Sequence, residues 1–111
     1  MAEKTPCDCT AIIPACNEAE GIVHVLRDLS GIDIIKEIIV VDDGSSDATV
    51  EKAERAGIAH LRIIRHDQNL GYGAALKTGI RAAQTEWILI IDADGTYPAD
   101  RIPDLANEIQ E

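Results

Sequence analysis

The segment EIIVVDDGSSD, residues 37–47, carries a clear signal for the fold class of this chain. The run at 37–41 is rich in Ile and Val, which is typical of a strand buried on both faces of a parallel sheet. It ends in the polar turn DDGSSD, whose last residue, Asp47, can cap a helix that runs to Gly57. The stretch therefore predicts a buried strand, a polar turn and a helix.

The same unit recurs along the chain. Further apolar runs occupy residues 9–13, 59–65 and 87–91, and helical patterns occupy residues 18–29, 73–83 and the segment from Pro103 onward. Asn17 is the expected cap of the first of these helices, with Glu20 in capping-box position. The order βαβαβαβα predicts a doubly wound α/β layer with a mostly parallel sheet, preceded by a polar tail at residues 1–8. The last helix reaches residue 111 without a stop signal, so we expect the chain to be truncated.

Composition excludes several classes of protein. The 111 residues fit one small domain, and 46% hydrophobic residues are enough for a compact core. A net charge of -10 argues against a nucleic-acid partner, because phosphate binding needs a clustered basic face. No apolar stretch approaches the roughly 20 residues that span a bilayer, and the three cysteines suggest no disulfide framework. We therefore expect a cytoplasmic protein, with membrane association open for its full-length form.

Polar clusters follow the four predicted strands at their carboxyl ends. In open parallel sheets this is the edge at which ligands bind. The clusters are PACNE at 14–18, DDGSSD at 42–47, NLGYG at 69–73 and DADG at 92–95. Their convergence on one edge predicts a binding site there, although each cluster alone is compatible with an ordinary loop.

The pair Asp92 and Asp94 is the candidate metal site. Two carboxylates separated by one residue concentrate negative charge, which a cation relieves. Hard divalent ions such as Mg²⁺ or Mn²⁺ prefer oxygen ligands and keep coordination positions for substrate phosphates. The alternative interpretation of the same residues is a solvated turn.

Two other clusters carry weaker signals. The carboxylates of Asp42 and Asp43 can accept hydrogen bonds from a base or from ribose hydroxyls, or they can serve only a helix cap. The glycine-rich segment 69–79 lacks the Walker spacing, but a helix N-terminus near Gly71 can help to bind an anion. Lys77, one turn inside that helix, faces either a diphosphate or solvent.

Taken in order, these motifs closely resemble the family 2 glycosyltransferases of the GT-A fold. The matching pieces are IIPACNE at 12–18, IVVDDGSSD at 39–47, NLGYGAAL at 69–76 and DADG at 92–95, within a resemblance that covers about Thr10 to Leu105. It implies that residues 1–111 are the nucleotide-sugar-binding portion of such a domain, with the acceptor-binding half absent. The segment DADGTYP at 92–98 looks most like the branch that charges polyprenyl phosphates, as dolichol-phosphate mannose synthases do.

The resemblance also implies roles for individual residues. It assigns to substrate binding the residues Pro14, Ala15, Glu18, Asp42, Asp43, Gly71, Lys77 and Asp92. Among these, Asp42 would accept a hydrogen bond from the base, with Asp43 nearby. Asp94, joined by Asp92, would hold Mg²⁺ or Mn²⁺ at the diphosphate. Many relatives have an aromatic residue at the position of Ala15.

The reaction that the resemblance implies is an inverting displacement at the anomeric carbon of a UDP- or GDP-linked sugar. The metal would act as a Lewis acid on the departing diphosphate. A sugar hydroxyl acceptor needs a general base, which we expect beyond residue 111, whereas a lipid phosphate at a membrane surface needs none. We therefore expect this chain to bind the donor weakly without turnover. An exposed sheet edge would allow a homodimer of the chain.

Two other functions stay open from the residues. A nucleotidyltransferase would also place acidic side chains beyond a parallel sheet, but PACNE at 14–18 is not the glycine-rich basic loop that opens such enzymes. A Mg²⁺-binding receiver-type signalling module gathers aspartates and a lysine around its ion. Its carboxylates follow the first and third strands, whereas the aspartate pairs here follow the second and fourth.

Overall fold

A computed structural model of the chain describes residues 8–94. Its elements are β1 (Cys9–Ala15), α1 (Ile22–Ser30), β2 (Ile35–Asp43), α2 (Thr49–Arg55), β3 (Leu61–His66), α3 (Tyr72–Ala82) and β4 (Trp87–Ile90). The four strands are parallel and lie in the order β3-β2-β1-β4. The helix expected from Pro103 lies outside the described residues.

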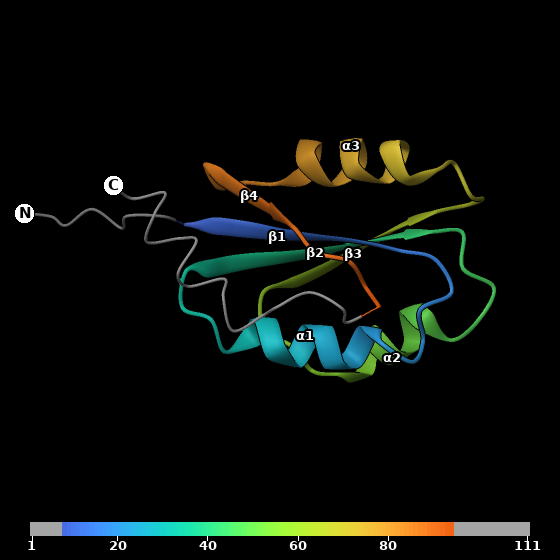
Figure 1. The fold of residues 1–111 in the computed structure, drawn as a ribbon, viewed down its shortest axis with the longest axis horizontal. Coiled ribbons are helices and arrows are strands. Elements are labelled where there is room, and N and C mark those ends of the chain that lie inside the picture. The colour runs from blue at the N-terminus through green and yellow to red at the C-terminus, as the bar shows by residue number, and fades with distance from the viewer. Residues whose placement is uncertain (1–7, 95–111) are drawn as a thin grey trace, which may run out of the picture.

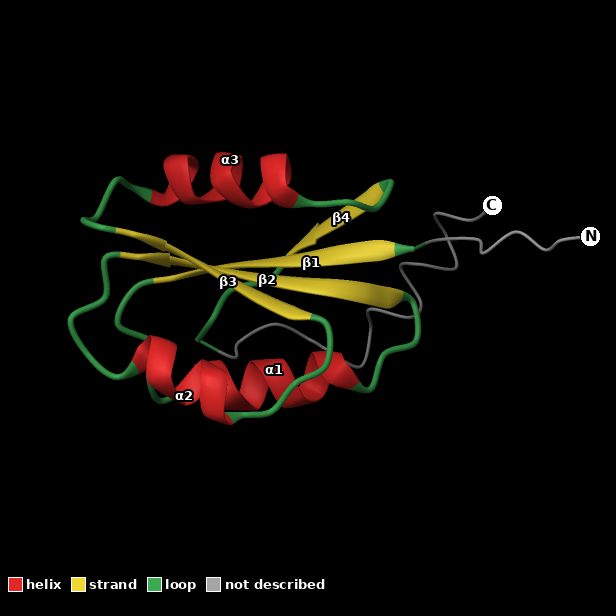
Figure 2. Ribbon diagram, turned by 180° about the vertical axis from the view of Figure 1, so that it is seen from behind, coloured by secondary structure: helices red, strands yellow, loops and turns green. Residues whose placement is uncertain are grey.

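The sheet is covered by helices on both faces, which confirms the predicted doubly wound α/β layer. Helices α1 and α2 lie side by side on one face, and α3 lies on the other (Figure 1). The view from behind shows the same three layers (Figure 2). Because all strands are parallel, their carboxyl ends meet at one edge of the sheet. The polar clusters of the sequence are therefore gathered at that edge.

The central strands β1 and β2 are buried on both faces, as their Ile- and Val-rich sequences predict. Alternate side chains of a strand point to opposite faces of the sheet. Ile13 and Val40 belong to the core on the side of α1 and α2, whereas Ile39 and Val41 pack with Ala75 on the side of α3. No helix within residues 8–94 has the length and apolar character needed to cross a bilayer.

A buried carboxylate network ties the strands together at the amino-end edge of the sheet. Glu37 Oε1 accepts hydrogen bonds from the Thr10 hydroxyl at 2.8 Å and the Gln84 amide at 3.0 Å. Its Oε2 accepts from Arg62 Nη1 at 3.0 Å. Burial on its own raises the pKa of Glu37, but these donors and the Arg62 charge together bring it below its ordinary value. Glu37 thus serves the fold, far from the motif-bearing edge.

The start of the first helix differs from the prediction. Helix α1 begins at Ile22, because the amides of Gly21 and Ile22 both donate to the Glu18 carbonyl in a separate turn. Asn17 does not cap this helix. Its backbone is in the left-handed region (φ 57), which asparagine tolerates, and its side chain binds the loop after β2 instead.

Smaller differences concern other element boundaries. Strand β2 extends to Asp43, so the first two aspartates of the DDGSSD segment, Asp42 and Asp43, are strand residues. Helix α2 begins at Thr49, and its N-cap residue is Ala48 instead of the predicted Asp47. Asp47 Oδ1 still accepts a hydrogen bond from the Thr49 amide at 3.0 Å. Strand β3 begins at Leu61 instead of residue 59, after His60 in the left-handed region (φ 61).

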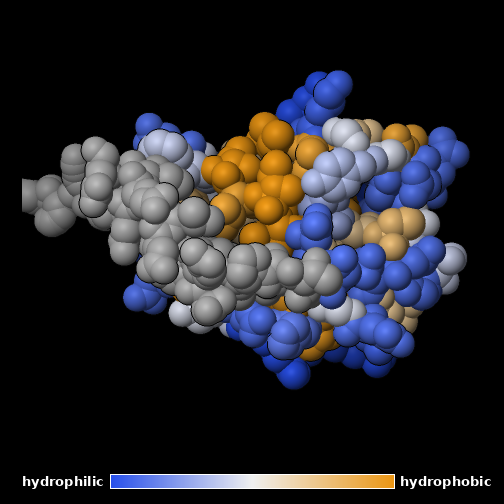
Figure 3. Space-filling model, in the orientation of Figure 1, coloured by the Kyte–Doolittle hydropathy of each residue, from blue (hydrophilic) through white to orange (hydrophobic). Residues whose placement is uncertain are grey.

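Apolar side chains are exposed along β4, which pairs with β1 alone among the described strands. Figure 3 shows apolar side chains gathered over this part of the molecule. The exposed large side chains here are Trp87, Ile88 and Ile90, with Ile80 on the neighbouring helix α3. The homodimer of the chain stays a prediction, which would use this exposed surface.

Candidate functional site

A cavity of about 260 Å³ opens at the carboxyl edge of the sheet, between the end of β1 and the start of α3. It is lined by Pro14, Ala15, Cys16, Glu18, Asp43, Asn69, Tyr72 and Ala75. Four of these, Pro14, Ala15, Glu18 and Asp43, were expected at the substrate. Cys16, Asn69 and Tyr72 lie inside the quoted motifs, but sequence reasoning gave them no role.

Asp43 and Glu18 are the two carboxylate residues in the lining of this cavity, and Asp43 is the more buried of them. Its Oδ1 accepts from the Leu70 amide and from His66 Nδ1, both at 2.8 Å, and its Oδ2 accepts from the Gly71 amide at 2.9 Å. Burial alone would raise the pKa of Asp43, but these donors and the nearby imidazole hold it below its ordinary value. Asp43 is therefore an ionised acceptor whose carboxylate also fixes the start of α3.

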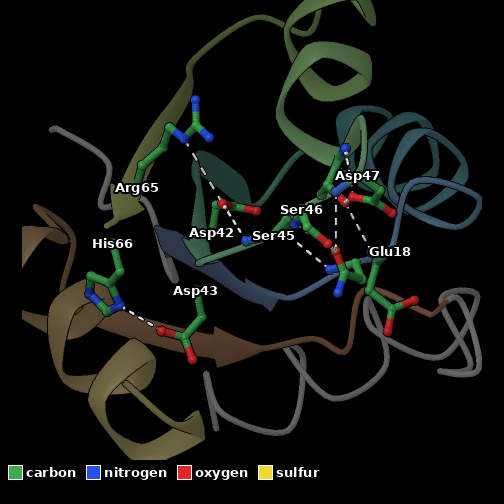
Figure 4. A network of polar contacts seen from close by, with 10 residues as sticks. Glu18, Asp42, Asp43, Ser45, Ser46, Asp47, Arg65 and His66 are labelled. Carbon is green, nitrogen blue, oxygen red and sulfur yellow. Dashed lines mark hydrogen bonds and ion pairs between the residues drawn. The ribbon is translucent and has the colours of Figure 1, made fainter. Parts of the chain in front are cut away.

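Asp42 is fully buried and lies outside the cavity lining, although it is the neighbour of Asp43. Adjacent strand residues point to opposite faces of the sheet. Asp42 Oδ2 accepts from the Ser45 amide at 3.2 Å and lies 4.0 Å from Arg65 Nε (Figure 4). Its Oδ1 has no hydrogen-bond partner within residues 8–94. The structure thus brings Asp43, and not Asp42, to the cavity.

The loop after β1 is clasped to the loop after β2, which fixes one wall of the cavity. Asn17 Oδ1 accepts from the backbone amides of Ser46 at 2.8 Å and Asp47 at 3.3 Å. The backbone amide of Asn17 donates to Ser45 Oγ at 2.8 Å. The Glu18 amide donates to Thr49 Oγ1 at 3.0 Å. Labelled residues from both loops lie side by side in Figure 4. The clasp sets the position of the Glu18 backbone beside the cavity.

Asp92 and Asp94 follow β4 at the same edge, and both are exposed. Between them Ala93 is buried in the core, which anchors the segment so that the flanking carboxylates face outward. No group of three or more His, Cys, Asp or Glu side chains within residues 8–94 is arranged to hold a metal ion. Two exposed oxygen ligands suit Mg²⁺ or Mn²⁺, which complete their coordination with phosphate and water.

Gly71 and Lys77 do not line the cavity. Gly71 precedes the first residue of α3 with φ 106, a left-handed conformation that glycine adopts without strain. Its amide donates a hydrogen bond to Asp43, so this donor at the helix N-terminus already has a partner within the chain. Lys77 is exposed on α3.

Comparison with known proteins identifies the family of the chain. Residues 10–111 match the sequence model of the family described as "Glycosyl transferase family 2". A dolichyl-phosphate beta-glucosyltransferase of Trichomonas vaginalis is 33% identical over 112 residues, covering 91% of this chain and 33% of its own length. The chain spans about a third of the length of the curated relatives that it matches.

Solved structures agree with the fold. A mannosyltransferase of Pyrobaculum calidifontis in complex with GDP-Man and Mn²⁺ superposes with a TM-score of 0.79 at 32% identity, over 93% of this chain and 31% of that one. A glucosyl-3-phosphoglycerate synthase of Mycobacterium tuberculosis, in complex with Mn²⁺, UDP-glucose and phosphoglyceric acid, superposes with a TM-score of 0.66 at 29% identity, over 77% and 32%. These matches decide against the nucleotidyltransferase and receiver-type alternatives.

Proposed function

The chain belongs to glycosyl transferase family 2, and on that premise we propose that it is the donor-binding part of a metal-assisted glycosyltransferase. The donor would be a nucleoside-diphosphate sugar bound at the carboxyl edge of the sheet. The observation that carries this proposal is the cavity in which Asp43 stands as a fixed, ionised acceptor. A carboxylate in such a position recognises the N–H of a base and rejects a ligand that lacks it.

The nucleoside would occupy the cavity between Pro14, Ala15 and the start of α3. Asp43 takes over in this proposal the role of base acceptor that the sequence suggested for Asp42, because Asp43 lines the cavity and Asp42 does not. A carboxylate has about four acceptor positions, and three donors within residues 8–94 occupy positions on Asp43. The remaining position, on Oδ2, would accept from the base. Many relatives have an aromatic residue at the position of Ala15, so in this chain the base would have no aromatic ring to stack on at that position.

Asp92 and Asp94 would hold Mg²⁺ or Mn²⁺ at the diphosphate. Their oxygen ligands fit such an ion, and structures of relatives contain Mn²⁺ beside a nucleotide sugar. The bound ion would supply Lewis-acid neutralisation of the charge that builds on the leaving diphosphate. The chain itself carries a net charge of -10, so the cation also makes an anionic donor acceptable at this edge.

The reaction would be an inverting displacement, in which an acceptor oxygen bonds to the anomeric carbon as the bond to the diphosphate breaks. We assign no general base within residues 8–94. A polyprenyl phosphate is the proposed acceptor, in line with the dolichyl-phosphate transferase among the relatives. Such a phosphate oxygen is already ionised, so it attacks without the help of a base. Since the chain spans only 33% of the length of this relative, we expect it to bind the donor without turning it over.

Calorimetric titration of UDP, GDP and their sugar conjugates, with and without Mn²⁺, tests the proposal. The variant Asp94→Asn should abolish the Mn²⁺-dependent part of the binding. Asp33→Asn makes the same charge change at an exposed position of the α1–β2 loop, at the opposite edge, and should bind like the parent chain. Absence of binding by every nucleotide, or equal binding by both variants, would contradict the proposed site.

A further inference from the structure

His66 lies between the candidate base acceptor and helix α3. It is the last residue of β3 and the register partner of Asp43 at the end of β2. The imidazole is 11% exposed and both of its nitrogens have partners. Nδ1 lies 2.8 Å from Asp43 Oδ1, and Nε2 lies 2.8 Å from Thr78 Oγ1 on α3. The ring therefore connects the cavity carboxylate to the body of the helix.

The chemistry of the partners fixes the roles of the two nitrogens. An ionised carboxylate only accepts, so Nδ1 carries a proton and donates to Asp43. The Thr78 hydroxyl can donate to a bare Nε2 or accept from a protonated one. The arrangement is thus satisfied in the neutral ring and in the charged ring. This makes the contact to Asp43 independent of which form is present.

The position of the Asp43 carboxylate depends on this contact. Among the described residues, Oδ1 is held by two donors, the Leu70 amide and His66 Nδ1, whereas Oδ2 is held by the Gly71 amide alone. Both amides belong to the loop that leads into α3, so they move with that loop. His66 is the donor that comes from the sheet itself. Without it, the orientation of the carboxylate would be set only by the loop.

We propose that His66 is a positioning residue for donor binding, which aims Asp43 Oδ2 at the base by holding Oδ1 against β3. The proposal rests on the proposed function of the cavity, and it adds a residue that lies outside the cavity lining. Thr78 sets the orientation of the imidazole from the other side. Fixing an acceptor before the ligand arrives lowers the entropy cost of binding, so the contact should strengthen nucleotide affinity.

Two amide variants separate positioning from a structural role. In His66→Asn the amide nitrogen replaces Nδ1 and can still donate to Asp43. In His66→Gln the amide nitrogen reaches the position of Nε2 and can serve only Thr78. The nucleotide affinity of His66→Gln, measured with UDP and GDP in the presence of Mn²⁺, should fall about tenfold, the effect of one charge-assisted hydrogen bond. His66→Asn should stay within about threefold of the parent chain. Equal affinities of the two variants, whether lowered or unchanged, would overturn the proposal.

Thr78 provides a second pair of variants that keep the imidazole. Thr78→Ser retains the hydroxyl and should bind nucleotide like the parent chain. Thr78→Val retains the shape and loses the hydroxyl, so the ring loses one of its two anchors and the affinity should fall about threefold. The same affinity in both variants would count against the proposal, even where a histidine variant fails to fold.

A readout without ligand distinguishes failure of this inference from failure of the proposed function. Amide protons of Leu70 and Gly71 that donate to a carboxylate give shifted NMR resonances and exchange slowly. His66→Gln should perturb both amides in the direction seen for Asp43→Asn, and His66→Asn should not. If neither UDP nor GDP binds to any variant, the proposed function is wrong, but the Leu70 and Gly71 resonances still test whether His66 positions Asp43. Equal spectra of the two histidine variants at Leu70 and Gly71 would then refute the positioning role.

Discussion

Gly21 and Ala93 lie so close together that a Cβ on Gly21 would stand 2.6 Å from the carbonyl oxygen of Ala93. The same atom would lie 3.2 Å from Asp94 Cα. Gly21 is the residue before the first turn of α1, and Ala93 separates the two candidate metal ligands. The start of the first helix is therefore packed directly against the candidate metal-binding segment. A glycine is required here for close approach of two backbones, since its φ of -96° is open to any residue.

Gly21→Ala should displace the segment 92–94 and weaken Mn²⁺-dependent nucleotide binding. Overpacking of this kind costs about 1–3 kcal/mol of unfolding free energy. Gly31→Ala, at the other end of the same helix, is the matched control, because a Cβ there meets nothing within 4 Å. Urea unfolding and calorimetry measure the two effects. Equal unfolding free energies and equal Mn²⁺-dependent affinities in the two variants would show that the contact with Ala93 has no consequence.

The neighbours Asp42 and Asp43 should differ in what they contribute. Asp43→Asn should lower nucleotide affinity by at least about tenfold, because it turns one acceptor oxygen into a donor in the cavity. Asp42→Asn should change the unfolding free energy and leave the affinity within about threefold, because Asp42 is buried away from the cavity. Calorimetry and thermal unfolding of both variants give the two quantities. A greater loss of affinity in Asp42→Asn would restore the role that the sequence suggested.

The depressed pKa values of Glu37 and Asp43 should make the fold sensitive to acid. Each carboxylate binds protons more weakly in the folded chain than in the unfolded chain, so its stabilising contribution is complete above its ordinary pKa, 4.5 for Glu37 and 3.8 for Asp43. That contribution is lost as pH falls through the lower folded value. Unfolding free energy should therefore decrease with pH below about 4.5. Stability that is constant down to pH 3 would contradict these shifts.

Glu37→Gln isolates one of these two groups. The variant loses the ion pair with Arg62 and should be less stable at pH 7 by about 1–3 kcal/mol, because the Arg62 guanidinium loses its charged partner. Its unfolding free energy should also vary less steeply between pH 5 and 3 than that of the parent chain. Urea unfolding across this range checks both points, and an unchanged slope would assign the acid sensitivity to other groups.

Asn17 should matter as an acceptor and not as a helix cap. Asn17→Asp retains an acceptor oxygen for the Ser46 and Asp47 amides and should unfold close to the parent chain. Asn17→Gly keeps the left-handed backbone without strain but loses the acceptor, so it should lose about 1–2 kcal/mol of unfolding free energy. Thermal unfolding of the pair checks this. Similar stability of both variants would mean that the clasp between the loops contributes little.

The homodimer expected from the exposed edge stays a prediction. Trp87, Ile88 and Ile90 are exposed along β4, and an apolar edge of this kind favours association. Light scattering over a range of concentrations should show the dimer, and Ile90→Lys should shift the population to monomer. Lys36→Glu is the control, because Lys36 is an exposed residue of β2, which is not an edge strand. This reversal of charge should leave the oligomeric state unchanged. A monomeric parent chain at all concentrations would refute the prediction.

The amino-acid sequence was sufficient to predict the fold class and the edge of the sheet at which the site lies. Ile- and Val-rich runs alternate with amphipathic helices, and that alternation leads to a parallel sheet whose carboxyl ends carry the polar motifs. Pro14, Ala15, Glu18 and Asp43 reach the cavity because they directly follow, or end, the two central strands. These positions follow from local sequence patterns, which can be recognised without the tertiary structure.

Which of the two neighbouring aspartates faces the cavity, and which donors hold it, follows from the packing of strands and helices and could not be predicted from the motif. Asp42 and Asp43 are neighbours in the motif and both are buried, but the alternation of side chains on β2 places Asp43 in the cavity lining and Asp42 outside it. Asn17 carries the signature of a helix cap, yet its amide oxygen is used across the two loops. His66 and Gly21 carry no signal of function in the sequence. Their roles come from residues distant in the sequence, Asp43 for His66 and Ala93 for Gly21, which only the packing of the strands and helices brings within contact distance.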